Sequence, residues 1–146
     1  MFFNAAEQIF LAENYQKALT TLQAYLEEYP NGSNILMADF YMAECYKNLG
    51  KKEQACDWYR KVIESGEGSF LELSSLNFAK LSYGLQRYSD AYAGYKSLLD
   101  NARIENNRHA AIVGMMNSAY AGKDYDAAIE SALKLAADKG SSKDDI

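Results

Sequence analysis

The chain has 146 residues and a formal net charge of −5; apolar residues make up 49% of it and aromatic residues 13%. This apolar content is enough for a hydrophobic core and argues against an intrinsically disordered chain. The acidic balance argues against nucleic-acid binding, which needs clustered lysine and arginine. A single proline among many Ala, Leu, Glu and Lys residues favours helices over a β-sandwich.

The first predicted elements are two helices, over residues 2–12 and residues 15–29. In the second of them, apolar residues recur at helical spacing from Ala18 to Tyr29. Asn14 is the expected N-cap, because its side-chain oxygen can accept from a backbone N–H that has no partner in the helix. Pro30 is expected to end this helix, because proline lacks the N–H donor that a further turn needs.

Three further pairs of helices follow in the same manner. Their expected bounds are residues 34–49 and 52–65, residues 70–85 and 89–102, and residues 107–121 and 125–137. The connections are short, so the two helices of each pair are expected to be antiparallel neighbours.

Several local signals mark the ends of these helices. Gly50 and Gly66 are expected to supply the positive φ angles that end helices. The segment Ser69-Phe70-Leu71-Glu72 predicts a capping box at a helix start. Asp124 and Asp126 fall in the turn that opens the last helix, where carboxylates interact favourably with the helix dipole.

The four helix pairs repeat one another. An alanine recurs in the second helix of each pair, at intervals of 37, 36 and 37 residues: Ala18, Ala55, Ala91 and Ala128. Small side chains also recur in the first helices, at Ala6, Ala43 and Ala79, and let the two helices of a pair approach closely. Tyrosines are expected to fill the gaps between pairs: Tyr15, Tyr46, Tyr59, Tyr88, Tyr95 and Tyr125.

One helix pair cannot bury its own apolar face, so the pairs are expected to stack and share a continuous core. The sequence therefore predicts an all-α fold, an α-solenoid of about four stacked antiparallel hairpins. The expected organisation is a single array over residues 1–146, with repeats at about residues 1–32, 33–67, 68–104 and 105–140.

The repeats resemble tetratricopeptide repeats (TPRs). The resemblance is carried by a small residue in the first helix, a tyrosine and an alanine in the second, an aromatic residue or leucine four residues later, and a final proline. The matching residues are Ala6, Tyr15, Ala18, Leu22 and Pro30; Ala43, Tyr46, Gly50, Ala55 and Tyr59; Ala79, Tyr88, Ala91 and Tyr95; and Tyr125, Ala128 and Ala132.

The chain departs from the usual TPR pattern in three ways. Its period is two or three residues longer than the usual 34, Lys52 stands where a tyrosine is expected, and the final proline occurs only at Pro30. The longer helices and the Tyr-Pro-Asn ending resemble, more weakly, the TPRs of bacterial cell-envelope lipoproteins and assembly factors.

The resemblance implies a right-handed superhelix whose concave face is lined by the first helix of each pair. The residues expected on this face are Phe3, Glu7, Phe10, Phe40, Tyr41, Glu44, Lys47, Asn48, Leu76, Asn77, Lys80, Tyr83, Val113, Asn117 and Tyr120. Aromatic residues with a few polar groups suit a peptide or helix of a partner protein. The sequence therefore indicates a protein–protein interaction module.

Two alternatives stay open for this face. Some TPRs clamp a partner's C-terminal carboxylate with lysine and asparagine in consecutive repeats, but here those places hold Phe40, Glu44 and Leu76. Phe40 and Leu76 could instead pack on neighbouring helices, which would leave the face merely solvated.

Catalysis has little support in the sequence, and neither an enzyme, a cofactor nor a metal is expected. His109, the single histidine, is expected to be a solvated residue near a helix start, and no Ser or Cys lies in a nucleophile motif. Cys45 and Cys56 are expected to be two small buried thiols, with a disulfide across the hairpin as the alternative.

A second hypothesis is architectural: the ends of the array would stack on further repeats or on another copy, because no polar capping helix is evident. Residues 141–146 resemble the start of another helix, so the chain is expected to be a piece of a longer protein. No run approaches the roughly 20 apolar residues that cross a bilayer. No signal peptide is evident either, and the sequence does not indicate a compartment.

Overall fold

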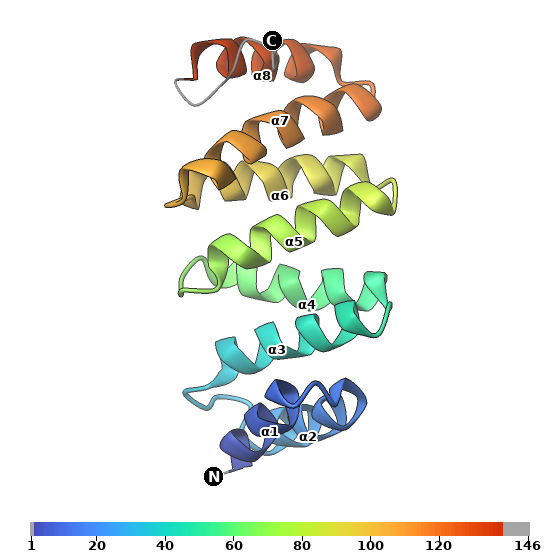
Figure 1. Ribbon diagram of the computed structural model, residues 1–146, viewed down its shortest axis with the longest axis vertical. Helices are drawn as coiled ribbons and strands as arrows, with labels where there is room; N and C mark the ends of the chain where they lie inside the picture. Colours follow the sequence, from blue (N-terminus) through green and yellow to red (C-terminus); the bar gives the residue numbers. More distant parts are fainter. Residues whose placement is uncertain (1, 139–146) are drawn as a thin grey trace. The chain divides into compact units, whose positions relative to one another are not determined.

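The computed structural model describes residues 2–138, which form eight α-helices and no strand (Figure 1). The predicted all-α fold of helix hairpins is confirmed. The capping-box signal at residues 141–146 lies outside the described residues. The helices are α1 (Phe2–Leu11), α2 (Tyr15–Glu28), α3 (Ile35–Asn48), α4 (Lys52–Ser65), α5 (Leu71–Gly84), α6 (Tyr88–Asn101), α7 (Glu105–Ala121) and α8 (Tyr125–Ala137).

The chain divides into two compact units, one formed by α1–α4 and the other by α5–α8. Each unit consists of two antiparallel hairpins that stack side by side, as in an α-solenoid. The organisation as a single four-repeat array stays a prediction. The bounds of α4 and α8 agree with the predicted ranges, and α7 begins two residues earlier than expected.

The turn inside each hairpin has the same backbone geometry. One residue per turn takes a positive φ angle: Glu13 (63°), Gly50 (77°), Gln86 (62°) and Lys123 (66°). The N–H of the next residue donates to a carbonyl five residues back, as from Asn14 to Ile9 and from Asp124 to Ala119. This is a Schellman motif, which satisfies the last carbonyls of the first helix.

The positive φ angles predicted at Gly50 and Gly66 are confirmed. The sequence did not reveal the other three left-handed positions, because Glu13, Gln86 and Lys123 are not glycines. The repeat interval would have located them, because Glu13, Gly50, Gln86 and Lys123 follow one another at intervals of 37, 36 and 37 residues.

Side-chain caps open two of the second helices. The Asn14 side chain accepts from Lys17 N–H at 3.4 Å at the start of α2. The Asp124 carboxylate accepts from Ala127 N–H at 3.2 Å at the start of α8, and Asp126 lies in the first turn of that helix. Both predicted starts are confirmed.

The predicted capping box at Ser69–Glu72 is wrong, because Glu72 has a different role. Helix α5 begins at Leu71, and the Glu72 carboxylate reaches the connection between α6 and α7 instead. It accepts from Arg103 N–H at 3.0 Å and from the Asn107 side chain at 2.7 Å. Burial alone raises the pKa of Glu72, but these hydrogen bonds outweigh it and hold that pKa below its usual value.

The core of the α1–α4 unit combines small and aromatic residues. Ala6 and Ala18 are completely buried where α1 meets α2, and Tyr15, Tyr41, Tyr46 and Trp58 pack against the same cluster. Two buried, unbridged thiols, Cys45 and Cys56, confirm that prediction. Burial raises the pKa of Cys45 to about 12.

In the α5–α8 unit, glycines allow two close helix contacts. A Cβ atom on Gly94 would lie 2.9 Å from the Ala79 Cβ, so α5 and α6 approach closely there. A Cβ on Gly114 would lie 2.5 Å from the ring of Tyr95, so the backbone of α7 packs directly against that ring. Tyr95 is half-buried, as its predicted place between hairpins requires.

Two residues of this unit differ from expectation. Tyr125 is exposed instead of filling a gap, because no helix follows α8 within residues 2–138; its ring packs on Tyr120 of its own hairpin at 5.8 Å. His109 is half-buried and not freely solvated, since its Nδ1 lies 3.5 Å from the buried Asp138 carboxylate. Arg108 pairs with the same carboxylate. Two residues near the start of α7 therefore contact Asp138, the residue that follows α8.

Candidate functional site

The first helix of each hairpin contributes to what we call the first-helix surface of a unit, which consists of α1 and α3 in one unit and α5 and α7 in the other. In the α1–α4 unit, aromatic rings stack on one another at this surface. The rings of Phe10 and Tyr41 stack with centroids 4.4 Å apart, and Phe3 lies beside both Tyr41 and Tyr25. The Tyr41 hydroxyl donates to the Glu7 carboxylate at 2.6 Å. Of these residues, Phe3 is buried, whereas Glu7, Phe10 and Tyr41 are partly exposed.

The polar groups on α3 are bound to other groups of the protein. The Glu44 carboxylate accepts from the Tyr59 hydroxyl and lies 3.2 Å from the Lys47 ammonium. The exposed Asn48 side chain donates to the Glu44 backbone carbonyl at 2.8 Å. These contacts fix the side chains on α3, and a ligand would have to compete with them.

Phe40 belongs to the core and not to an accessible surface. It is 5% exposed, stacks on Phe70 at 4.4 Å and meets Tyr59 edge to face at 6.3 Å. The alternative in which Phe40 packs inside the protein and does not face a ligand is therefore correct for this residue. Neither Phe40 nor Phe3 is available to a ligand in this structure.

The first-helix surface of the α5–α8 unit is more accessible. Lys80 and Tyr83 are exposed on α5, and Asn117 and Tyr120 are exposed on α7 at the places 37 residues further on. Tyr83 is 39% exposed and Tyr120 is 68% exposed. The remaining predicted residues of this surface are partly covered: Leu76, Asn77 and Val113.

The ring of each of these two tyrosines packs against the ring of another tyrosine, which is the first residue of the second helix in the same hairpin. The Tyr83 ring meets Tyr88 edge to face at 5.3 Å, and Tyr120 meets Tyr125 in the same way at 5.8 Å. An aromatic pair of this kind limits the rotation of the exposed ring. The unit therefore presents two similarly supported tyrosines.

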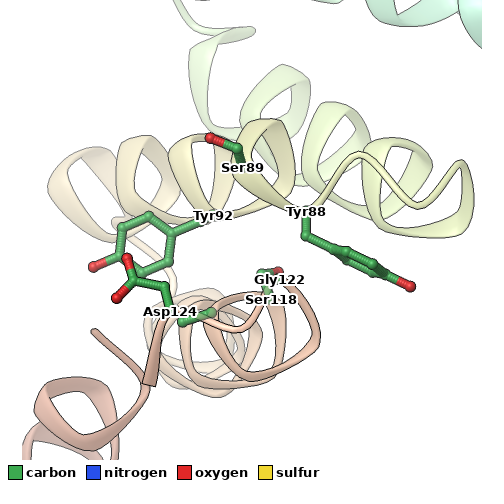
Figure 2. A pocket seen from close by; sticks show the side chains of 7 residues that line it. Tyr88, Ser89, Tyr92, Ser118, Gly122 and Asp124 are labelled. Carbon is green, nitrogen blue, oxygen red and sulfur yellow. The ribbon is translucent and has the colours of Figure 1, made fainter. Parts of the chain in front are cut away.

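A hollow of about 280 Å³ lies between the start of α6 and the turn that joins α7 to α8. Figure 2 shows the Tyr92 ring and the Asp124 carboxylate on one side of it and the Tyr88 ring on the other. Asp124 caps α8, and no side chain that lines the hollow is a histidine or a cysteine. The polar side chains other than tyrosine in its lining are Ser89, Ser118 and Asp124.

A second hollow, of about 360 Å³, opens on α7 and α8, and sequence reasoning missed it. Its lining is mostly apolar: Met116, Asn117, Tyr120, Tyr125, Ala128, Ile129 and Ala132. Ile129 and Leu133 are strongly exposed on α8. The repeat alignment contained a usable signal, since Ile129 stands at the place of Tyr92.

Residues 2–138 hold no group of three or more His, Cys, Asp or Glu side chains that could bind a metal ion. None of the helices in that range is both long enough and apolar enough to cross a membrane.

We expect the stability of the α1–α4 unit to depend on pH through Tyr41. Burial, followed by the hydrogen bond to Glu7 and the charge of Glu7, raises the pKa of Tyr41 from 10.0 to about 12. A pKa raised by folding gives stability that is complete below the unfolded pKa and is lost as pH rises through the folded pKa. Stability should therefore fall between about pH 10 and about pH 12.

Urea unfolding followed through Trp58 fluorescence checks this, at about pH 9 and about pH 11.5. The pH dependence should be smaller in Tyr41→Phe than in the unaltered protein, because phenylalanine has no proton to lose. An equal loss of stability in both proteins would contradict the prediction.

Comparisons with known proteins give consistent results. The sequence model of the tetratricopeptide repeat family matches residues 2–32 and 37–65. The chain is also similar to a TPR repeat-containing protein of Methanocaldococcus jannaschii, with 33% identity over 91 residues. That match covers 60% of this chain and 28% of the relative, so the chain spans little more than a quarter of that protein.

Two solved structures share the fold. A double mutant of MamA RS-1 superposes with a TM-score of 0.67 and 16% identity over 91% of this chain and 70% of that chain. MamA 41-end from Desulfovibrio magneticus RS-1 gives a TM-score of 0.66 and 16% identity over 91% of this chain and 71% of that chain. At this identity the likeness concerns the fold alone.

Proposed function

We propose that this chain is a tetratricopeptide repeat protein, as its matches to that family support, and that the first-helix surface of its α5–α8 unit binds a segment of a partner protein. The match of the tetratricopeptide repeat model to residues 2–32 and 37–65 supports a protein-interaction or scaffold module. The binding surface proposed within this module consists of Lys80, Tyr83, Asn117 and Tyr120, and we refer to it as the tyrosine surface.

The observation that supports this proposal is the repetition of an exposed, supported tyrosine. Tyr83 and Tyr120 occupy equivalent places in the repeat, and each ring packs edge to face against another tyrosine ring. Tyrosines held in this way lose little conformational freedom on binding and offer both an apolar ring and a hydroxyl, which is why they are enriched at interfaces. Lys80 and Asn117 add one charge and one amide beside them.

The α1–α4 unit is the poorer candidate. Its aromatic residues Phe3 and Phe40 are buried, and its carboxylates Glu7 and Glu44 accept from Tyr41 and Tyr59. A partner would gain little new apolar contact there, and it would have to compete for polar groups that already have partners. We therefore assign recognition to the tyrosine surface.

Site-specific photocrosslinking in cells that express the protein tests this proposal. A benzophenone amino acid at Lys80 should form a crosslink to a discrete partner, whereas the same amino acid at Lys96, an exposed lysine on α6, should not. The crosslink at Lys80 should disappear when Tyr83 and Tyr120 are both replaced by serine. A crosslink that persists in the double variant, or one that is equally strong at Lys96, would contradict the proposal.

A further inference from the structure

The hollow between the start of α6 and the turn that joins α7 to α8 contains a buried hydroxyl that lacks a partner. Ser118 is 1% exposed, and its hydroxyl forms no hydrogen bond with any group of residues 2–138. Figure 2 shows Ser118 between Tyr92 and Tyr88 in the lining of this hollow. An unpartnered buried hydroxyl lowers stability, so a ligand that bonds to it would remove this cost.

The charge in the lining of the hollow is negative. Asp124 is exposed, and one of its carboxylate oxygens accepts from Ala127 N–H at 3.2 Å. Figure 2 shows this carboxylate beside the Tyr92 ring. Arg87 and Lys123 are neighbours of lining residues in sequence, but both are exposed and neither lines the hollow. The lining therefore favours a cation and disfavours an anion.

Two tyrosine rings add a second attraction for a cation. Tyr88 and Tyr92 are half-buried and lie on opposite sides of the hollow (Figure 2). A cation within about 6 Å of the centre of such a ring is attracted to its face. The volume of about 280 Å³ lies below the range of roughly 300–1,000 Å³ that is typical of drug-sized ligands. The hollow therefore suits a single side chain or a small molecule.

The same contact in the α1–α4 unit has a different composition. The counterparts of Tyr92, Ser118, Ala119, Gly122 and Asp124 two repeats earlier are Leu19, Cys45, Tyr46, Leu49 and Lys51. Leu19 and Cys45 are buried in the core cluster, and Tyr46 packs against it. The α5–α8 unit thus has smaller or more polar residues at these places, and a negative charge where the other unit has a positive one. Packing of the repeat alone does not require these residues.

We propose that this hollow binds the ammonium group of a short alkylamine, carried by a lysine side chain or by a small free amine. The ammonium group donates to the Asp124 carboxylate and to the Ser118 hydroxyl, and its charge lies over the face of the Tyr92 ring. We call this hollow the amine site. None of the residues that line it belongs to the tyrosine surface, so the two proposals can fail separately.

Amide NMR spectra of the 146-residue chain test the proposal, with n-butylammonium chloride as the probe. The amide signals of Ser118 and Gly122 should shift and saturate in the millimolar range. The neutral alcohol n-butanol has a similar size and shape and should not shift them, because it carries no charge. Nα-acetyl-lysine methylamide represents the other source of the same group. Either amine supports the proposal by binding, and the tighter one identifies the source.

Asp124→Asn should weaken binding of n-butylammonium about fivefold, because it removes the ion pair. Asparagine is as good an N-cap as aspartate, so α8 should still begin at the same residue. Asp126→Asn is the matched control: it removes the same charge two residues later, at a side chain that does not line the hollow, and should leave the affinity unchanged. Tyr92→Leu, which installs the residue found at Leu19, should also weaken binding about fivefold.

Ser118→Ala separates binding from stability. It should weaken binding without lowering the thermal midpoint of unfolding, because the hydroxyl that it removes has no partner. A lower midpoint with unchanged binding would contradict the role given to Ser118.

Three further results would overturn the proposal. In the first, neither amine shifts the Ser118 and Gly122 signals, and the hollow then holds only water. In the second, n-butanol binds as well as n-butylammonium, or Asp126→Asn weakens binding as much as Asp124→Asn. In the third, binding appears only after Lys139 and Lys143 are both replaced by glutamine, which would identify a lysine of the chain itself as the occupant.

Discussion

Replacing Phe40 with alanine is expected to lower the free energy of unfolding of the α1–α4 unit by about 3–5 kcal/mol. The ring is 5% exposed and stacks on Phe70 at 4.4 Å, so its removal leaves a cavity in the core. Urea unfolding followed through Trp58, which lies in the same unit, measures the change. Tyr29→Ala is the control, because Tyr29 is 45% exposed and should cost no more than about 1 kcal/mol.

This experiment also separates stability from recognition at a residue that the sequence places on the binding surface. A Phe40→Ala protein that loses partner binding should have lost it through unfolding of its unit. If Phe40→Ala costs no more than Tyr29→Ala, the ring is not part of the core and the packing described for it is wrong.

Replacing Gly114 with leucine is expected to destabilise the α5–α8 unit by about 3 kcal/mol. Removing a glycine from a helix interior is worth about 1 kcal/mol in the opposite direction, so the steric conflict must exceed that gain. The conflict is specific, because a Cβ at Gly114 would lie 2.5 Å from the Tyr95 ring. Thermal unfolding followed by circular dichroism, with hydrogen exchange of the α7 amides, measures the loss.

A double variant identifies the cause. Gly114→Leu together with Tyr95→Ala should recover at least half of the lost stability, because the new side chain then fills the space that the ring has left. Gly84→Leu provides the matched control, since nothing lies within 4 Å of a Cβ there; this change should be neutral or slightly stabilising. Equal losses at Gly84 and Gly114 would mean that the Tyr95 contact is not responsible.

Both predictions concern how the side chains of neighbouring helices fit together. The Phe40 ring packs against Phe70 and Tyr59, and the backbone of Gly114 in α7 packs against the Tyr95 ring of α6. A change in side-chain volume at either place therefore disturbs the packing of its unit.

Recognition of the repeats required only the spacing of residues. The alanines at intervals of 37, 36 and 37 residues lie where helices of one hairpin meet, and Ala18, Ala55 and Ala91 are completely buried. The predicted helices are confirmed because apolar spacing, the caps at Asn14 and Asp124 and the glycine at Gly50 are local signals. Local signals act between residues a few positions apart, so they can be seen in a sequence.

The binding surface could be predicted only in part, because exposure depends on neighbours that are distant in sequence. Phe40 and Tyr83 both lie in first helices at places that the TPR resemblance assigns to the concave face. Phe40 is nevertheless covered by Phe70, whereas Tyr83 remains accessible. The role of Glu72 was misjudged for the same reason: its partners lie more than thirty residues further along the chain.

The sequence was sufficient to establish the period, the helices and the hairpins, because each of these depends on residues within one repeat. The tertiary structure decided which aromatic side chains are buried, which tyrosines face solvent and where a hollow remains on α8. Those outcomes depend on how the volume of one side chain meets that of another from the next hairpin, as at Gly114 and Tyr95. Close packing is a property of such pairs in space, and the periodicity of a sequence does not specify it.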